Sequence, residues 1–286
     1  MNRKVKYFAP ASINEAIRLL AESGDKVNVL AGGTDLAPMI NRYELQPEVI
    51  LYIGNLELDY IKEVAGTIVI GTCVTLAQIL ESELLKEKAD VLVQAASDSS
   101  STAIRTTATI GGNIMNASPA GDMIPPLFVL DAQLVLISQC GERTVSIKEF
   151  FTGPGTTVRK PDELLKEIRI PAGEGKCAFV KLGKRKAQVL SVVSCAARVV
   201  QQNGLIKEVH LALGSVAPTV VCESKAAHGM LGKPFSAELA SDAAQAAMNM
   251  VKPIDDARAT AWYRKTAGVA VVKKAIFAAA GVEYSE

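Results

Sequence analysis

Two glycine pairs, each at the end of an apolar stretch, place the strongest constraint on how this chain can fold. The first lies in Ala31-Gly-Gly-Thr-Asp35, after the run Val27–Leu30, and the second lies in Thr109-Ile-Gly-Gly-Asn113. Glycine lets a backbone approach another group closely, and a turn that leaves a strand exposes peptide N–H groups that can hold an anion. Neither segment places a Lys or Arg among its glycines. Backbone donors alone suit a diphosphate that stays in place, so the pairs predict a resident dinucleotide.

The composition is that of a globular protein with no electrostatic preference for nucleic acid. The 286 residues are enough for two ordinary domains, each with its own core. Apolar residues make up 49% and charged residues 21%, which leaves little room for extended disorder. The formal net charge is +1, and no cluster of Lys and Arg is interleaved with aromatic residues. Nucleic acid is therefore not expected as a partner.

The apolar stretches are too short to cross a membrane. Those at 124–137 and 267–282 are interrupted by Asp131 and by Lys273-Lys274. The N-terminus continues into Pro10 and a helix-capping sequence, where a secretory signal would have its apolar core. We therefore expect a cytoplasmic protein with no membrane span.

The cysteines and histidines do not form a metal or catalytic motif. The cysteines are widely spaced and contain no Cys-x-x-Cys pair, at Cys73, Cys140, Cys177, Cys195 and Cys222. This spacing argues against a disulfide framework, a zinc site or an iron–sulfur cluster in this chain. The only histidines, His210 and His228, have no Glu-x-x-His motif, and no Gly-x-Ser-x-Gly elbow exists. We expect no metal ligand and no catalytic side chain of a hydrolytic kind.

The first part of the chain mixes short strands with helices. The capping box Ser12-Ile-Asn-Glu15 begins a helix that ends at Gly24, and a short helix is predicted over Leu36–Asn41. Further helices are predicted over 76–88 and 91–97, and strands over 27–30, 47–53, 67–71, 134–138 and 167–170. The best linker is at 171–176.

Beyond the linker the pattern changes. Gln202-Asn-Gly204 between two apolar runs predicts a β-hairpin. Two or three helices are predicted after it, over 221–231, 237–250 and 257–280. The fold class is therefore predicted as α+β, with an antiparallel sheet covered by helices at the C-terminal end.

Several polar segments have more than one interpretation. The run Ser97-Asp-Ser-Ser-Ser-Thr102 could be a linker, but its place before the second glycine pair favours an ordered functional loop. Asp122 could cap a helix or accept a hydrogen bond from a ribityl or ring group, and both are compatible. The basic cluster Lys181-Leu-Gly-Lys-Arg-Lys186 is either a solvated surface or a source of a cation for a dinucleotide between domains. The first glycine segment matches neither the Rossmann fingerprint nor a P-loop.

Taken in order, these segments resemble the FAD-binding medium subunit of the molybdenum hydroxylases, the group of xanthine, carbon monoxide and nicotinate dehydrogenases. The resemblance covers essentially the whole chain. It is carried by Phe8-Ala-Pro-Ala-Ser, Leu30-Ala-Gly-Gly-Thr-Asp-Leu36, the segment from Ile104-Arg105 to Asp122, Gly153-Pro-Gly155, Asp162-Glu-Leu-Leu165, Ile170-Pro171 and Lys181-Leu-Gly-Lys-Arg185.

The resemblance implies a fold and a cofactor site. An FAD-binding domain of the PCMH type would occupy residues 1–172, with subdomains at about 1–55 and 56–172, and a CO dehydrogenase flavoprotein C-terminal-like domain would occupy 173–286. Both glycine segments would bind the FAD diphosphate, Ser118 and Asp122 would contact the cofactor, and Leu165 and Lys181 would line its site. The full set implied is Val29, Leu30, Ala31, Gly32, Gly33, Thr34, Asp35, Leu36, Ile104, Thr109, Ile110, Gly111, Gly112, Asn113, Ser118, Asp122, Leu165 and Lys181.

The function implied is electron transfer within a heterotrimer. FAD would take electrons from a 2Fe-2S cluster in a small subunit and deliver them to NAD or another acceptor, while a large subunit would hold the molybdopterin cofactor. The alternatives are a self-contained flavin oxidase or reductase and a nucleotide-binding module without flavin. This chain has Ala103-Ile-Arg-Thr106 where relatives often have Gln-Ile-Arg-Asn, and Ala187-Gln188 where many have Asp, and these positions bear on the electron acceptor.

Overall fold

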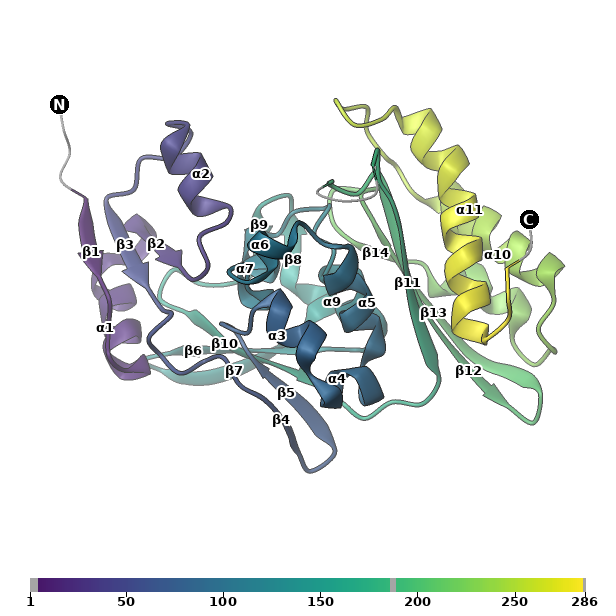
Figure 1. The fold of residues 1–286 in the computed structure, drawn as a ribbon, viewed down its shortest axis with the longest axis horizontal. Coiled ribbons are helices and arrows are strands. Elements are labelled where there is room, and N and C mark those ends of the chain that lie inside the picture. Colours follow the sequence, from purple (N-terminus) through teal and green to yellow (C-terminus); the bar gives the residue numbers. More distant parts are fainter. Residues whose placement is uncertain (1–4, 186–188, 285–286) are drawn as a thin grey trace.

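The computed structural model describes residues 5–185 and 189–284. Within them the chain forms three successive units, each built on its own main sheet. The three units lie in a row, from the purple end of the chain to the yellow end (Figure 1). Lys186 and the Ala187-Gln188 pair lie outside the described residues. The order of units places the middle one between the other two, so a site at their junction can draw on all three.

The first unit is a small parallel sheet in the order β1-β3-β2, with β3 in the centre. Its elements are β1 (Lys6–Phe8), α1 (Ile13–Ser23), the 3-10 turn η1 (Gly24–Lys26), β2 (Val27–Leu30), α2 (Leu36–Asn41) and β3 (Val49–Tyr52). The Ser12 hydroxyl caps α1 by accepting from the Glu15 N–H, and Gly24 ends the helix at φ 55°. The buried face of α1, with Ile17 and Leu20, packs in one apolar cluster with Leu51 of β3.

The middle unit is a five-stranded antiparallel sheet in the order β4-β5-β10-β6-β7. Its helices are α3 (Leu76–Glu81), α4 (Glu83–Lys88), α5 (Asp90–Asp98), α6 (Thr102–Arg105), α7 (Ile110–Asn116), α8 (Ile124–Val129) and α9 (Ile147–Phe150). Its strands are β4 (Ile61–Val64), β5 (Thr67–Gly71), β6 (Gln133–Ser138), β7 (Gly141–Ser146), the small hairpin β8 (Phe151–Gly153) with β9 (Thr156–Thr157), and β10 (Leu164–Ile170). The helices α3 to α7 lie on one side of this sheet (Figure 1).

The third unit is an antiparallel sheet in the order β11-β12-β13-β14. It comprises β11 (Lys176–Leu182), β12 (Val193–Gln202), β13 (Leu205–Gly214), β14 (Val221–Cys222), the 3-10 segment η2 (Ser224–Met230), α10 (Ala237–Met250) and α11 (Ala261–Ala280). Strand β12 is buried on both faces: Ala196 belongs to the core of the middle unit, whereas Cys195 and Ala197 belong to the core under α10 and α11. The sheet is thus held between the middle unit and its own helices (Figure 1).

The predicted α+β class with a C-terminal antiparallel sheet and helices is confirmed. The hairpin is confirmed as well, since Asn203 and Gly204 join β12 to β13 at φ 53° and 77°. The strand at 27–30 and the helices at 36–41 and 237–250 also form with the expected bounds. In the part of the chain described here, no helix combines the length and apolarity that a membrane crossing needs.

Three element predictions are wrong. The helix expected over 221–231 is β14 followed by η2, because Val221 pairs with Leu213 at the edge of the sheet. The helix expected over 76–88 is two helices, since Ser82 ends α3 and its hydroxyl caps α4 by accepting from Leu85 N–H at 3.3 Å. The last helix begins at Ala261, not at 257, because the Thr260 hydroxyl accepts from the Tyr263 N–H at 3.2 Å.

Candidate cofactor site

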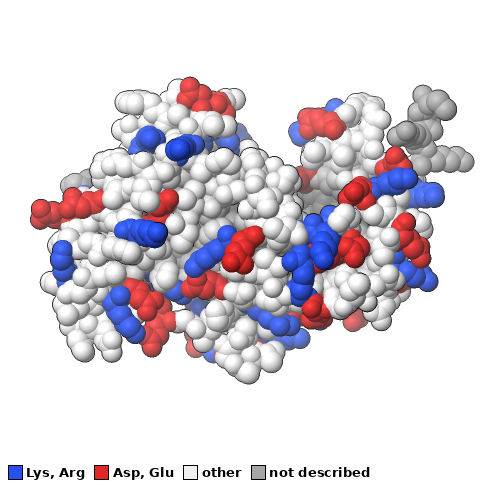
Figure 2. Space-filling model, turned by 180° about the vertical axis from the view of Figure 1, so that it is seen from behind, with Lys and Arg blue, Asp and Glu red and all other residues white. Residues whose placement is uncertain are grey.

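A cavity of about 760 Å³ opens where the three units meet. Its wall includes residues 27–36 of the first unit, residues from 99 to 122 and from 159 to 165 of the middle unit, and Arg185, Val189 and Leu190 of the third. Seen from behind, the molecule has a notch in its upper outline between two lobes (Figure 2). Ligand cavities in proteins measure roughly 300–1,000 Å³, so this one is large enough for an extended ligand.

The first glycine pair offers unused backbone donors to this cavity. The N–H groups of residues 32–36 make no hydrogen bond to any described residue. These residues lead into α2. Gly33 has φ 71°, and a Cβ added at Gly32 would lie 1.8 Å from the Thr107 carbonyl oxygen. Glycine is therefore required for the turn and for its contact with the second segment. A row of free N–H groups at the start of a helix suits an anion.

The second glycine pair contributes in a different way. It forms the first turn of α7, where the Ile110 N–H donates to Val74 O at 2.9 Å and the Gly111 N–H to Thr72 O at 3.0 Å. The Gly112 N–H donates to the Thr109 hydroxyl at 3.0 Å. A Cβ added at Gly111 would lie 1.8 Å from Thr72 Oγ1. These N–H groups are committed within the chain, so this pair allows α7 to pack closely as part of the cavity wall.

Asn113 brings an unsatisfied acceptor to the cavity. It lies one turn into α7 and lines the wall, and its Oδ1 is buried with no hydrogen-bond partner among the described residues. Buried polar atoms in native proteins nearly always have a partner. A donor from a ligand or from solvent is therefore needed at this point of the cavity.

Asp122 is the centre of a buried polar network at the base of the wall. Only 7% of Asp122 is exposed. Its Oδ2 accepts from Lys181 Nζ at 2.6 Å and from the Ser99 hydroxyl at 3.2 Å, and its Oδ1 accepts from the Ser191 hydroxyl at 2.5 Å. The interpretation of Asp122 as a helix cap is wrong, because α8 begins after Met123 with no side-chain cap. The carboxylate is instead held by Ser99 of the middle unit and by Lys181 and Ser191 of the third unit.

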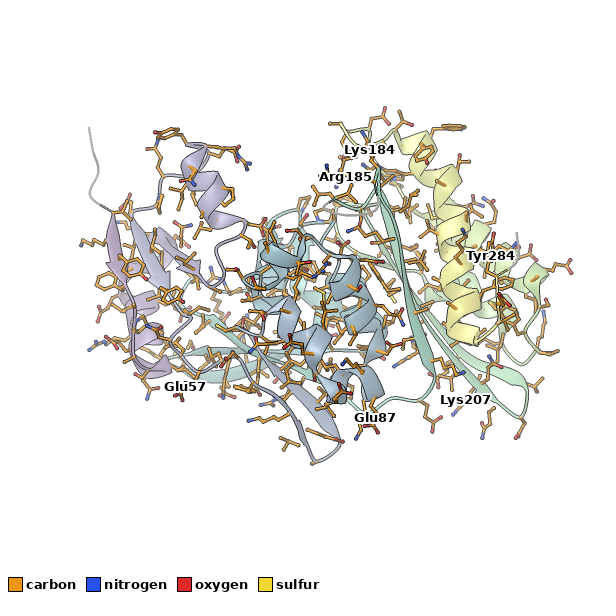
Figure 3. The ribbon with its side chains drawn as sticks, in the orientation of Figure 1. Glu57, Glu87, Lys184, Arg185, Lys207 and Tyr284 are labelled. Atoms are coloured by element: carbon orange, nitrogen blue, oxygen red, sulfur yellow. The ribbon has the colours of Figure 1, made fainter. Side chains whose placement is uncertain are left out.

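The described part of the basic cluster, residues 181–185, is divided between interior and surface. The Lys181 side chain is buried against Asp122, and its Nζ also donates to Asp98 O at 3.0 Å. Lys184 and Arg185 lie at the upper end of β11 (Figure 3), where Lys184 Nζ donates to Ala257 O at 2.7 Å and Arg185 lines the cavity. The solvated-surface interpretation is therefore wrong for Lys181.

Most of the residues singled out from the sequence come together on this wall. The exceptions are Ile110, which is fully buried, and Lys181, which lies behind Asp122. Those on the wall are Val29, Leu30, Ala31, Gly32, Gly33, Thr34, Asp35, Leu36, Ile104, Thr109, Gly111, Gly112, Asn113, Ser118, Asp122 and Leu165.

Sequence reasoning missed Arg159 and Glu163, which line the cavity from the turn before β10. Burial lowers the pKa of Arg159, and its Nη1 donates to the Glu163 carbonyl at 2.9 Å. The Glu163 carboxylate accepts from Arg143 Nη2 at 2.8 Å and from the Lys160 N–H at 2.7 Å. No local motif marks Arg159, and the segment Asp162-Glu-Leu-Leu165 carries the resemblance without assigning Glu163 to the site. Their place on the wall depends on the pairing of distant strands.

The serine run is part of the wall as well. Ser99, Ser100 and Ser101 line the cavity between α5 and α6, with Ser100 at φ 53°. Arg105 Nη1 holds this turn by donating to the carbonyls of Ser97 and Ser99 at 3.0 and 3.1 Å. The expectation of an ordered loop here is confirmed.

The chain matches two family models that together cover almost all of it. Residues 3–173 match the FAD binding domain in molybdopterin dehydrogenase, and residues 178–279 match the CO dehydrogenase flavoprotein C-terminal domain. The carbon monoxide dehydrogenase medium chain of Hydrogenophaga pseudoflava is 33% identical over 280 residues, covering 96% of this chain and 97% of that one. The xanthine dehydrogenase FAD-binding subunit of Escherichia coli O157:H7 is 31% identical, covering 96% and 97%.

Solved structures agree with the sequence matches. Carbon monoxide dehydrogenase from Hydrogenophaga pseudoflava superposes with a TM-score of 0.94 at 32% identity, covering 97% of this chain and 98% of that one. Quinoline 2-oxidoreductase from Pseudomonas putida 86 superposes with a TM-score of 0.92 at 26% identity, covering 98% and 99%. The chain therefore belongs to the family of FAD-binding subunits of the molybdenum hydroxylases.

Proposed function

We propose that this chain is the electron-transfer subunit of a heterotrimeric hydroxylase and that its FAD lies in the cavity between the three units. The FAD would receive electrons from a 2Fe-2S cluster in a small subunit and pass them to NAD or another acceptor. The substrate would be oxidised at a molybdopterin cofactor in a large subunit. The observation that carries the proposal is the cavity itself, which combines free backbone N–H groups at residues 32–36 with the unpaired Asn113 Oδ1.

The donors and acceptors present in the cavity fit FAD. The N–H groups of residues 32–36 can donate hydrogen bonds to a diphosphate without a lysine. Asn113 Oδ1 can accept from a ribityl hydroxyl or a ring N–H. When bound, FAD itself supplies the one-electron and two-electron redox chemistry, so the protein needs to bind it, orient it and limit its exposure to water.

The mouth of the cavity supports contact with other subunits or with an acceptor. Ile104 and Leu190 line the cavity and remain 42% and 61% exposed. Two apolar side chains beside the cavity thus remain available for contact with a partner. Ala103 and Thr106, where relatives often carry Gln and Asn, lie in and next to α6 beside Ile104.

The experiment is to purify the native complex and measure flavin, iron and molybdenum per chain. We expect FAD in a one-to-one ratio with this chain, and iron and molybdenum in constant proportion to it. Flavin without iron and molybdenum would instead identify a self-contained flavin oxidase or reductase. Absence of flavin from both the complex and a reconstituted chain would overturn the cofactor assignment.

The acceptor is tested on the same complex. The flavin is first reduced chemically without oxygen, and NAD⁺ is then added while the flavin absorption is followed. Rapid reoxidation with formation of NADH supports NAD as the acceptor. Reoxidation only by an artificial dye or by oxygen contradicts it.

A further inference from the structure

Arg264 on α11 is a buried arginine outside the cavity. It is only 1% exposed, it is the largest of the fully buried side chains among the described residues, and it does not line the cavity wall. A buried guanidinium is costly to desolvate unless it is paired and hydrogen-bonded. Its partners therefore indicate what its burial achieves.

The guanidinium joins two backbone segments of the third unit. Arg264 Nη1 donates to Val192 O at 2.7 Å and to Ser215 O at 2.9 Å. Its Nη2 donates to Asp256 Oδ1 at 2.6 Å, which neutralises the buried charge. A single side chain thus holds the residues that precede β12 and follow β13.

Each of the two segments contacts the wall of the cofactor cavity. Ser191, next to Val192, donates its hydroxyl to Asp122 Oδ1 at 2.5 Å. The Ser215 N–H donates to Pro119 O at 2.8 Å, and Ser215 has a positive φ of 63° that a non-glycine residue adopts only under constraint. We call Arg264 and the two segments that it joins, 191–192 and 215, the clamp. The clamp therefore contacts the segment 118–122 at two points.

Asp256 and Arg258 complete the clamp. Arg258 Nε and Nη2 donate to Asp256 Oδ2 at 2.9 and 2.5 Å, and Arg258 Nη1 donates to Ser191 O at 3.3 Å. Burial by itself would raise the pKa of Asp256. The hydrogen bonds from the Arg258 side chain, and those from the N–H groups of Arg258 and Ala259, instead hold this pKa well below its usual range. The carboxylate is therefore charged and can pair with both arginines.

The junction between the units is packed too closely to absorb a shift of these segments. A Cβ added at Gly214, beside Ser215, would lie 2.4 Å from Ser194 Oγ and 3.2 Å from Cγ of Pro125 in α8. Packed interiors transmit small displacements because few voids exist to absorb them. Movement of residues 192 or 215 would therefore be passed to residues 118–122.

We propose that Arg264 is a positioning residue for the FAD site: together with Asp256 it fixes the Ser191 and Ser215 segments and, through them, the orientation of the Asp122 carboxylate. The proposal rests on the FAD site proposed above. It assigns to the C-terminal unit an indirect influence on a cofactor whose proposed diphosphate donors lie in the first unit.

The test replaces Arg264 by Lys in the full chain, which keeps the charge but lacks the planar guanidinium whose two separate nitrogens reach Val192, Ser215 and Asp256 together. FAD binding is measured by fluorescence titration, and the visible circular dichroism and midpoint potential of the bound flavin are recorded. We expect the Kd for FAD to rise roughly tenfold and the dichroism to change, because Asp122 loses its fixed orientation. Ser191→Ala should change the same properties in the same direction.

The matched control is Arg198→Lys. Arg198 is also largely buried and paired, to Asp131 at 2.8 Å, but it has no hydrogen bond to the segments 191–192, 215 or 118–122 among the described residues. We expect this variant to lower the melting temperature while the Kd and the dichroism stay at their wild-type values.

Combining the two changes separates positioning from general destabilisation. The double variant Arg264→Lys/Ser191→Ala should weaken FAD binding by less than the sum of the two single effects, because both changes act on the orientation of the Asp122 carboxylate. Unchanged FAD affinity and dichroism in Arg264→Lys, or fully additive effects, would overturn the proposal. If Arg264→Lys does not fold, Asp256→Asn takes its place with the same expectations. Failure of the wild-type chain to bind FAD would instead contradict the proposed function.

Discussion

At the scale of single residues, Asn113 is a residue of the cavity wall whose buried side-chain oxygen, Oδ1, lacks a hydrogen-bond partner among the described residues. A neutral hydrogen bond contributes about 0.5–1.5 kcal/mol net, which corresponds to a change in affinity of roughly two- to tenfold. Asn113 is therefore expected to contribute to FAD affinity more than to stability.

We expect Asn113→Ala to weaken FAD binding by roughly two- to tenfold and to leave the melting temperature of the FAD-free chain unchanged or slightly higher, because an unsatisfied group is removed. Fluorescence titration and thermal denaturation measure the two effects. Asn249→Ala, on α10 and away from the cavity, serves as the control. Equal FAD affinities for Asn113→Ala and wild type would contradict this role.

Gly32 is the second residue whose surroundings allow us to predict the effect of a substitution. A Cβ there would lie 1.8 Å from the rigid backbone oxygen of Thr107, so the two segments must separate. We expect Gly32→Ala to lower the free energy of unfolding by about 1–3 kcal/mol and to impair FAD binding strongly. Gly229→Ala is the matched control, because nothing lies within 4 Å of a Cβ at Gly229. Wild-type stability and FAD affinity in Gly32→Ala would refute the close approach.

At the scale of elements, the turn before β10 depends on an ion pair that titrates. Burial would raise the pKa of Glu163, but the hydrogen bonds from Arg143 and from the Lys160 N–H lower it below its usual range. A glutamate in an unfolded chain titrates near pH 4.3. The contribution of Glu163 to stability is therefore complete above that pH and is lost as the pH falls toward the depressed folded-state pKa.

We expect Glu163→Gln to destabilise the chain at neutral pH and to reduce the loss of stability on acidification from about pH 7 to about pH 4. Urea denaturation at both pH values measures this difference. Glu57→Gln is the control, because Glu57 is exposed at the lower left of the molecule (Figure 3) and makes no ion pair among the described residues. An unchanged pH dependence in Glu163→Gln would show that the ion pair with Arg143 contributes nothing.

Elements whose ends are marked by capping or turn residues could be predicted from the sequence. The helix α1 has the Ser12 cap and Gly24, and the β12–β13 hairpin has Asn203-Gly204, and all of these signals act within a few residues. The segment 221–231 could not be predicted in this way, because its first residues form a strand only where β13 offers a free edge. Tertiary pairing there outweighs the local helical pattern.

At the scale of the whole molecule, the cavity is bounded by all three units. A ligand that binds only the folded arrangement stabilises it by RT ln(1 + [L]/Kd), which is about 2.7 kcal/mol at a hundredfold excess over Kd. We expect the melting temperature to rise with FAD concentration and to rise less with riboflavin, which lacks the diphosphate that residues 32–36 would hold. Equal stabilisation by riboflavin and FAD would argue against a diphosphate site at the first glycine pair.

The sequence by itself determined the α+β class, the family and a set of site residues most of which line the cavity, because glycine turns, caps and polar motifs act locally. Only the tertiary structure decided how the two glycine pairs differ: the N–H groups of residues 32–36 stay free, while those of Ile110 and Gly111 bond to Val74 and Thr72. The clamp from Arg264 to Val192 and Ser215 is likewise a product of packing. Hydrogen-bond partners far apart in the chain are set by how the sheets and helices assemble, and no local pattern carries that information.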